Sequence, residues 1–167
     1  LFCTPTYALR LPEVAQDARI DLSNNQLRTI IVAGETGGSQ SSLREKISEA
    51  WHGARVMDHY GMTEVGPVAY EIPGGQGGLR IMEESYFPEV VDPQSGRPVS
   101  TGELGELVLT SLGRVGCPVL RYRTGDLVKV KKGMDGQGNS TFDLIGGILG
   151  RTDDMIVVRG VNLYPAA

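Results

Sequence analysis

The first third of the sequence alternates between strand-like and helical patterns, and this constrains the fold more than any other feature. Residues 27–33 form a run rich in β-branched residues that ends at Gly34, which is typical of a buried parallel strand. A glycine-rich turn, residues 34–39, leads into residues 41–51, whose apolar side chains recur at helical spacing. Residues 55–58 form a second short strand. Strand, glycine turn, helix and strand predict a βαβ unit, so we expect an α/β fold here.

The pattern changes near residue 75. A further helix is expected before this point, over residues 9–18, but helical periodicity is absent after it. Six short strand candidates alternate with turn residues instead, at 79–82, 88–91, 105–110, 119–122, 127–130 and 141–145. We therefore expect mostly antiparallel β structure, arranged as a small distorted β-barrel. The expected organisation is an α/β subdomain over residues 1–75, a β-barrel-like subdomain over residues 76–150, and a hinge with the start of a small C-terminal domain over residues 151–167.

Composition excludes several classes of partner. The chain has 167 residues and a net charge of −4, so it lacks the positive charge that nucleic acid or an acidic membrane surface attracts. Cys3 and Cys117 are far apart in sequence, which argues against a disulfide framework or a zinc site and favours the cytoplasm. There is no apolar run of transmembrane length and no signal peptide. We expect no nucleic-acid or membrane partner, and we interpret both ends as internal positions of a longer protein.

Residues 59–64, with the sequence HYGMTE, follow the second strand and carry several groups that suit a nucleotide. Tyr60 can stack on a planar ring, and Gly61 lets the backbone approach that ring closely. The Thr63 hydroxyl can donate to a phosphate oxygen. Glu64 offers a hard oxygen ligand of the kind that Mg²⁺ prefers. The alternatives are that Tyr60 is a core aromatic and that Glu64 is a solvated loop acid.

Three other places are candidates for ligand contacts. Asp126 could accept hydrogen bonds from two vicinal sugar hydroxyls, or it could be a simple turn residue. Arg151 carries a planar donor fork that suits sugar and phosphate oxygens, or it could form a surface ion pair with Asp153 or Asp154, which would contribute little. The turn at residues 34–39 lies where open α/β sheets bind ligands, although Ser39 or Ser41 could simply cap the following helix.

Three stretches resemble, in the order in which they occur, the motifs of the acyl-adenylate-forming ligase superfamily. They read YGMTE at residues 60–64, YRTGD at residues 122–126 and GRTDD at residues 150–154. The superfamily includes acyl-coenzyme A synthetases, peptide-synthetase adenylation domains and luciferases. Within it the chain is most similar to the phenylacetate–coenzyme A ligase family, with further likeness at residues 3–9, 31–35, 118–123 and 154–165. The resemblance covers nearly the whole chain and implies the C-terminal part of the large domain of such an enzyme.

The resemblance implies a reaction in two steps. A carboxylate attacks the α-phosphate of ATP and gives an acyl-adenylate and pyrophosphate, and the thiol of coenzyme A then displaces AMP. It also implies that ATP, coenzyme A and a phenylacetate-like aryl acid are the substrates, and that Mg²⁺ binds at the phosphates. Such an enzyme would act in the catabolism of phenylacetate-like acids.

Roles for single residues follow from the resemblance by position. It implies these contacts with the nucleotide: Gly34, Glu35 and Thr36 beside adenine, Tyr60 stacked on it, and Asp126 and Arg151 at the ribose. Thr63 would hold the α-phosphate and Glu64 would bind Mg²⁺. Asp153 would be the hinge of a small C-terminal domain. Gly160 would leave room for the pantetheine arm, and Gly61 would lie near the acyl pocket.

Two parts of the family's active site are not found in the sequence. They are the phosphate loop that precedes this region and a lysine of the small C-terminal domain, so we expect this chain to be inactive by itself. Two alternatives stay open: a non-catalytic module that binds AMP or ATP, and the related synthetase that adenylates a deazaflavin coenzyme. For the oligomeric state, we consider a homodimer formed through an exposed sheet edge.

Overall fold

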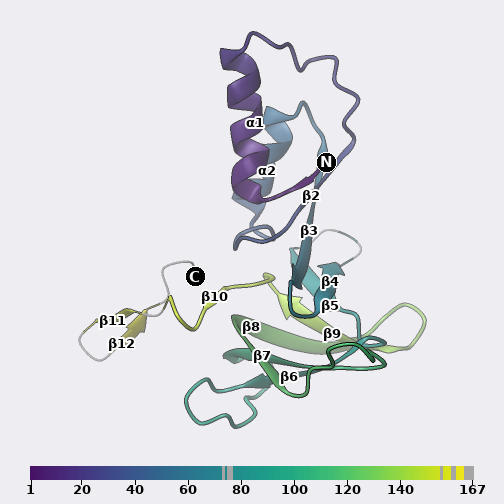
Figure 1. Ribbon diagram of the computed structural model, residues 1–167, viewed down its shortest axis with the longest axis vertical. Coiled ribbons are helices and arrows are strands. Elements are labelled where there is room, and N and C mark those ends of the chain that lie inside the picture. Colours follow the sequence, from purple (N-terminus) through teal and green to yellow (C-terminus); the bar gives the residue numbers. More distant parts are fainter. Residues whose placement is uncertain (73, 75–76, 155, 159–160, 164–167) are drawn as a thin grey trace.

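The computed structural model describes residues 1–72, 74, 77–154, 156–158 and 161–163 (Figure 1). Its elements in chain order are β1 (Phe2–Cys3), α1 (Pro5–Asp17), β2 (Thr29–Val32), α2 (Ser41–Ala50), β3 (Arg55–Met62), β4 (Gly66–Glu71), β5 (Gly78–Ile81), β6 (Tyr86–Val91), β7 (Leu104–Ser111), β8 (Tyr122–Met134), β9 (Ser140–Ile145), β10 (Gly150–Arg151), β11 (Ile156–Val158) and β12 (Val161–Leu163). Strands β1 to β10 form a 10-stranded sheet, and β11 pairs with β12 in a separate sheet of two strands.

The N-terminal part consists of two successive βαβ units. Strand β2 pairs in parallel with β1 on one side and with β3 on the other. Helices α1 and α2 lie beside each other against these strands (Figure 1), where Ile30, Val32 and Val56 are buried beneath them. The predicted βαβ unit is thus confirmed. Strand β1 and the first unit were not predicted, because a strand of two residues carries no periodicity.

Helix α1 begins at Pro5, earlier than the predicted start at residue 9. The Thr4 hydroxyl oxygen accepts a hydrogen bond from the backbone N–H of Tyr7, and Pro5 occupies the first helical position, a combination that favours a helix start. Helix α2 begins after Gln40, whose side chain makes no capping hydrogen bond. Neither helix is both long and apolar enough to cross a membrane, and the described residues contain no other that is.

Strand β3 joins the two parts of the sheet. Residues 55–58 pair in parallel with β2, whereas residues 59–62 pair in antiparallel fashion with β4. The expectation that this strand ends at residue 58 is therefore wrong, because a second partner takes over its hydrogen bonds. The register shifts between Tyr60 and Gly61, which is the mark of a β-bulge.

Beyond β3 the sheet is antiparallel throughout. Its strand order runs β3-β4-β5-β9-β8-β7-β6, so the prediction of antiparallel β structure is confirmed, and among the described residues the sheet is open rather than closed into a barrel. The strand candidate at residues 119–122 differs from the structure. Residues 119–121 lie outside any strand, because Arg121 has a φ of 48° and the extended backbone of β8 begins only at Tyr122.

Two groups of buried side chains form the core. One lies between the helices and the parallel strands and includes Ile47 and Trp51, whose indole N–H donates to the Ala8 carbonyl oxygen at 2.6 Å. The other fills the curved antiparallel sheet and extends from Tyr60 in β3 to Leu144 in β9. Strand β3 contributes side chains to both groups. The parallel and the antiparallel parts of the sheet are therefore each joined to β3 by side-chain packing as well as by backbone hydrogen bonds. The division into subdomains at residues 75 and 150 stays a prediction.

The bulge at Gly61 gives a test of this arrangement. A Cβ at this position would lie 2.7 Å from the Gly66 carbonyl oxygen and 3.1 Å from the Pro67 Cα, and both are backbone atoms of the adjacent strand. We expect Gly61→Ala to lower the free energy of unfolding by about 1–3 kcal/mol, because the β3–β4 pair must separate to admit the methyl group. Urea unfolding followed by circular dichroism measures this loss.

Gly116→Ala is the matched control. No heavy atom lies within 4 Å of the position of its added Cβ, so the free energy of unfolding should stay within about 0.5 kcal/mol of the wild-type value. Equal stability of the Gly61→Ala variant and the wild-type protein would contradict the close β3–β4 approach.

Candidate functional site

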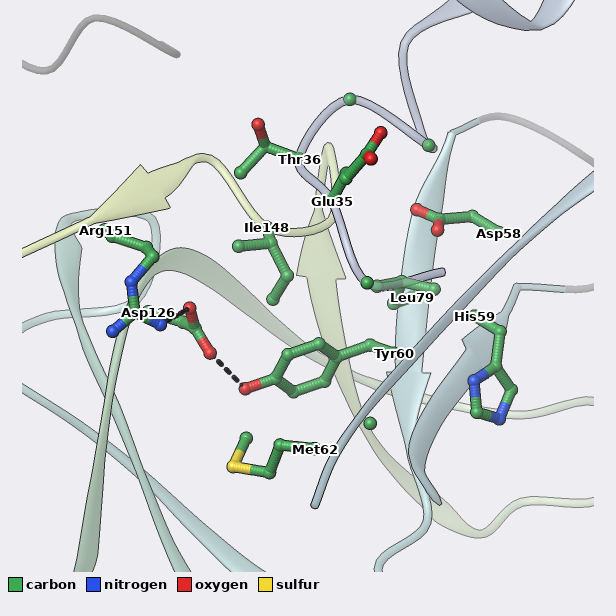
Figure 2. Close-up of a pocket in the computed structure, with 14 residues that line it drawn as sticks. Glu35, Thr36, Asp58, His59, Tyr60, Met62, Leu79, Asp126, Ile148 and Arg151 are labelled. Atoms are coloured by element: carbon green, nitrogen blue, oxygen red, sulfur yellow. Dashed lines mark hydrogen bonds and ion pairs between the residues drawn. The ribbon is translucent and has the colours of Figure 1, made fainter. Parts of the chain in front are cut away.

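A cavity of about 210 Å³ lies where β3 passes from the parallel to the antiparallel strands (Figure 2). Its wall comes from segments distant in sequence: the turn after β2, the strand β3, Leu79 of β5, Asp126 of β8, and the segment that contains Ile148 and β10. The structure brings together in this wall most of the residues predicted from the sequence: Gly34, Glu35, Thr36, Tyr60, Gly61, Asp126 and Arg151.

Tyr60 and Asp126 meet inside this cavity wall. The Tyr60 hydroxyl donates to Asp126 Oδ2 at 2.5 Å, and Figure 2 shows the phenol directed toward the carboxylate. The two residues are 8% and 7% exposed. Burial and the Asp126 carboxylate raise the pKa of Tyr60, so the hydroxyl stays a donor. Burial also raises the pKa of Asp126, against the opposing effects of the Tyr60 hydroxyl and the Arg151 guanidinium.

Arg151 links Asp126 to Asp153. Its Nη1 donates to Asp126 Oδ1 at 3.1 Å, while Nε and Nη2 donate to the two carboxylate oxygens of Asp153 at 2.8 Å and 3.2 Å. Strand β10 places it there, because Arg151 lies opposite Asp126 on β8. The hydrogen bond from Arg151 lowers the pKa of Asp153. The ion pair with Asp153 that the sequence suggested is therefore present, and the same guanidinium also contacts Asp126.

The turn after β2 is fixed by a contact with the start of α1. The Glu35 carboxylate accepts hydrogen bonds from the Thr6 backbone N–H at 2.9 Å and the Thr6 hydroxyl at 2.7 Å. Partial burial raises the pKa of Glu35, but these hydrogen bonds lower it by more, so the net shift is downward. Glu35 is therefore a negatively charged anchor of the turn that carries Gly34 and Thr36. Ser39, considered as a helix cap, instead donates to Asp58 Oδ2 at 2.5 Å.

Asp58 is a charged cavity residue that the sequence did not reveal, and Leu79 and Ile148 also line the cavity without having been predicted. Asp58 precedes Tyr60 by two positions, so both side chains project from the same face of β3. Asp58 lines the cavity and is 8% exposed. Burial raises its pKa, although the Ser39 hydroxyl acts in the opposite direction. The alternation of side chains along a strand was the signal that could have identified it, once β3 was known to continue through Tyr60.

Thr63 and Glu64 lie apart from the cavity wall. Both are exposed in the turn between β3 and β4. Burial and the Glu64 and Asp126 carboxylates raise the pKa of Tyr122. Among the described residues, no group of three or more His, Cys, Asp or Glu side chains is placed to hold a metal ion. The single carboxylate of Glu64 suits Mg²⁺ only where the phosphates of the substrate supply further ligands to the ion. Gly160 lies outside the described residues.

The pH dependence of stability tests the Tyr60–Asp126 hydrogen bond. The native pKa of Asp126 is raised above its ordinary value of 3.8. At a pH between the ordinary and the native pKa, the native protein therefore binds more protons than the unfolded chain. The contribution of Asp126 to the free energy of unfolding falls as the pH rises through that range. Tyr60→Phe raises this pKa further. We expect the variant to lose about 1.5–3 kcal/mol of unfolding free energy at pH 7, and to lose less below the native pKa, where Asp126 is protonated in both proteins. Denaturant unfolding at several pH values measures the difference.

Tyr86→Phe is the matched control for this experiment. Tyr86 is also buried, but its hydroxyl donates to the backbone carbonyl oxygen of Val65 at 2.5 Å, and this acceptor does not titrate. Its stability loss should be the same at every pH at which the protein is folded. A loss for Tyr60→Phe that is equally independent of pH would show that the hydroxyl does not bind an ionised carboxylate.

Several known proteins are similar to this chain in sequence. No protein-family model matches the chain. Phenylacetate–coenzyme A ligases from Pseudomonas putida and Thermus thermophilus are each 37% identical to it, over 167 and 165 residues. The alignments cover 99% and 98% of this chain but only 36% of each relative, so the chain spans about a third of the length of the relatives it matches.

A solved structure extends the likeness to the fold. The 2-hydroxyisobutyryl-CoA ligase in its postadenylation state, in complex with 2-HIB-AMP, matches with a TM-score of 0.87 and 33% sequence identity. The match covers 99% of this chain and 35% of that one. In sequence and in fold, the chain is therefore a homologue of the acyl-adenylate-forming coenzyme A ligases, and it corresponds to about a third of such an enzyme.

Proposed function

We propose that this chain provides the nucleotide-binding wall of an aryl-acid–coenzyme A ligase. The complete reaction converts a phenylacetate-like acid, ATP and coenzyme A into the acyl-coenzyme A, AMP and pyrophosphate through an acyl-adenylate. One observation carries the proposal. In a homologue of phenylacetate–coenzyme A ligases, Tyr60, Asp126 and the turn at residues 34–36 come from separate parts of the chain and line the same cavity.

The adenine is held by Tyr60 and the turn at residues 34–36. Because the Tyr60 hydroxyl is already bound to Asp126, the ring is fixed in orientation and offers its face for stacking. Gly34 has a φ of 85°, a conformation that glycine adopts without strain, so the turn brings its backbone to the cavity. The Asp58 carboxylate, two residues before Tyr60 on β3, supplies an acceptor for an amino group of the base.

The ribose is held by Asp126. A carboxylate offers about four acceptor sites, of which the Tyr60 hydroxyl and Arg151 Nη1 occupy two. The remaining sites can accept hydrogen bonds from both ribose hydroxyls. Arg151 adds a positive charge beside the sugar and keeps Asp126 from being an isolated buried anion, which would be costly.

The reacting phosphate is placed next to the turn that carries Thr63 and Glu64. In this role, Thr63 donates its hydroxyl to the α-phosphate and Glu64 helps to bind Mg²⁺, which would neutralise charge on the phosphates. Their exposure at the end of β3 supports contact with groups outside the adenosine cavity. We assign to Asp153 the hinge between the two half-reactions, and to Gly160 the passage of the pantetheine arm.

We also propose a cellular compartment, a metabolic role and an oligomeric state for the enzyme. Both cysteines, Cys3 and Cys117, are free thiols, which suits a cytoplasmic enzyme that acts in the catabolism of phenylacetate-like acids. A homodimer through the outer edge of β1 is the proposed oligomer, since β1 ends the strand order and pairs only with β2 among the described strands. Exposed edges of this kind favour pairing with another chain.

Binding of AMP to the chain tests the site directly. Asp126→Ala removes the acceptor for the ribose hydroxyls, and we expect it to weaken AMP binding by about tenfold or more, as measured by isothermal titration calorimetry. Asp92→Ala is the control, because Asp92 caps an exposed turn at Gln94 and Ser95 and should leave the affinity unchanged. Equal affinities of the wild-type protein and the Asp126→Ala variant would exclude the ribose assignment.

A chimera tests the activity. This chain is substituted for the matched third of the Pseudomonas putida phenylacetate–coenzyme A ligase, and pyrophosphate release is measured with a series of aryl acids. We expect release that depends on the acid and is lost in the Asp126→Ala chimera. A folded chimera that binds AMP but releases no pyrophosphate with any acid would contradict the ligase proposal and favour a non-catalytic AMP- or ATP-binding module.

A further inference from the structure

We propose that Glu106 is a positioning residue that sets the ribose-binding geometry of Asp126 through the backbone of Gly125. This inference rests on the proposed function, because it concerns the same nucleotide site. Glu106 lies on β7, outside the cavity wall, and is only 2% exposed. Burying a carboxylate is unfavourable unless it is paired and hydrogen-bonded, so its partners indicate what the residue is for.

The segment that carries Asp126 is a bulge in the sheet. Glu106 pairs with Leu127 and Val108 pairs with Arg123, so residues 124–126 of β8 lie opposite a single residue of β7. Such a bulge redirects a side chain but leaves backbone groups without partners from the regular ladder. Gly125, at its centre, has a φ of 77°.

Glu106 supplies the missing partner. Its Oε1 accepts a hydrogen bond from the Gly125 backbone N–H at 3.1 Å, and its Oε2 accepts one from Arg123 Nε at 2.9 Å. On the other side of the same peptide segment, the Gly125 carbonyl oxygen accepts from the Thr152 backbone N–H at 2.7 Å. Both backbone groups of Gly125 are therefore held, one by Glu106 and one by the segment after Arg151.

Thr124 completes the support of the bulge. Its hydroxyl donates to the Leu107 carbonyl oxygen at 2.8 Å and accepts from the Asp126 backbone N–H at 3.0 Å. Asp126 thus follows a backbone that is fixed on both sides, and its carboxylate is presented to Tyr60 and Arg151 at the observed distances. Displacement of Gly125 would move the Asp126 carboxylate directly, because the two residues are adjacent.

The two partners of Glu106 differ in their freedom to move, and this makes the proposal testable. The Arg123 side chain is 53% exposed, so it can follow a displaced carboxylate or turn to water. The Gly125 N–H belongs to the backbone and cannot follow. Glu106→Gln keeps the length and can keep an acceptor for Gly125 while it loses the charge. Glu106→Asp keeps the charge for Arg123 but is shorter by one carbon–carbon bond and no longer reaches Gly125.

The experiment compares AMP with 2′-deoxy-AMP by isothermal titration calorimetry on the full chain. We expect the wild-type protein to bind AMP about tenfold more tightly, because the deoxy compound lacks one donor to Asp126. In Glu106→Asp this preference should fall to about twofold or less, whereas Glu106→Gln should stay within about twofold of the wild-type preference. Retention of the preference in Glu106→Asp and its loss in Glu106→Gln would overturn the proposal, since that order indicates a role for the charge pair alone.

Glu89→Gln is the matched control. Glu89, on β6 of the same sheet, forms an ion pair with Arg121 at 3.0 Å, and its side chain makes no hydrogen bond or ion pair with residues 124–126 in the described structure, so the preference for AMP should not change. A loss of stability alone would lower the fraction of binding-competent protein for both ligands and leave their ratio constant.

A ligand-free measurement separates this proposal from the proposed function. If the wild-type chain bound neither compound, the proposed nucleotide site would fail, but the effect of Glu106 on Asp126 would still be measurable from the carboxyl-carbon NMR titration of Asp126. We expect this titration to move toward that of an exposed aspartate in Glu106→Asp, because the loosened bulge admits water, and to be unchanged in Glu106→Gln. An unchanged titration in Glu106→Asp would overturn the positioning role.

Discussion

The whole arrangement depends on a change of hydrogen-bonding partner within one strand. The first half of β3 completes a parallel ladder with β2, and its second half opens the antiparallel sheet with β4. At this transition, side chains on one face of β3 pass from the helix-covered core to the cavity, with Val56, Asp58 and Tyr60 in succession. The cavity lies at this transition, and Asp58 and Tyr60 are part of its lining (Figure 2).

The second constraint is that the cavity places negative groups in a poorly solvated wall. Asp58 and Asp126 are both buried, and burial raises the pKa of each. Each is compensated by a hydroxyl donor, Ser39 or Tyr60, and Asp126 also by a guanidinium. Both carboxylates are thereby held in place, so under the proposed function a nucleotide would bind with little reorganisation of these side chains.

Local signals in the sequence predicted part of this arrangement and could not predict the rest. The βαβ unit follows from periodicity, and the motif residues Tyr60, Asp126 and Arg151 do line one cavity. The length of β3 did not follow, because its second half is a strand only by virtue of β4. Glu106 was also missed, since the bulge that gives it a partner arises from the pairing of β7 with β8. In both cases the structure depends on pairing between strands, which is a long-range interaction, whereas periodicity and turn residues report only local structure.

If these segments form one adenosine site, NMR chemical-shift changes on titration with AMP test this assignment most directly. Backbone amide signals of residues 34–38, residues 58–61, Asp126 and Arg151 should shift together, with a common saturation curve. Residues 25–28 and 52–54, which line a separate hollow of the surface, should be unaffected. Shifts confined to that hollow, or the absence of any change at saturation in residues 34–38, in residues 58–61 or in the pair Asp126 and Arg151, would contradict the assignment.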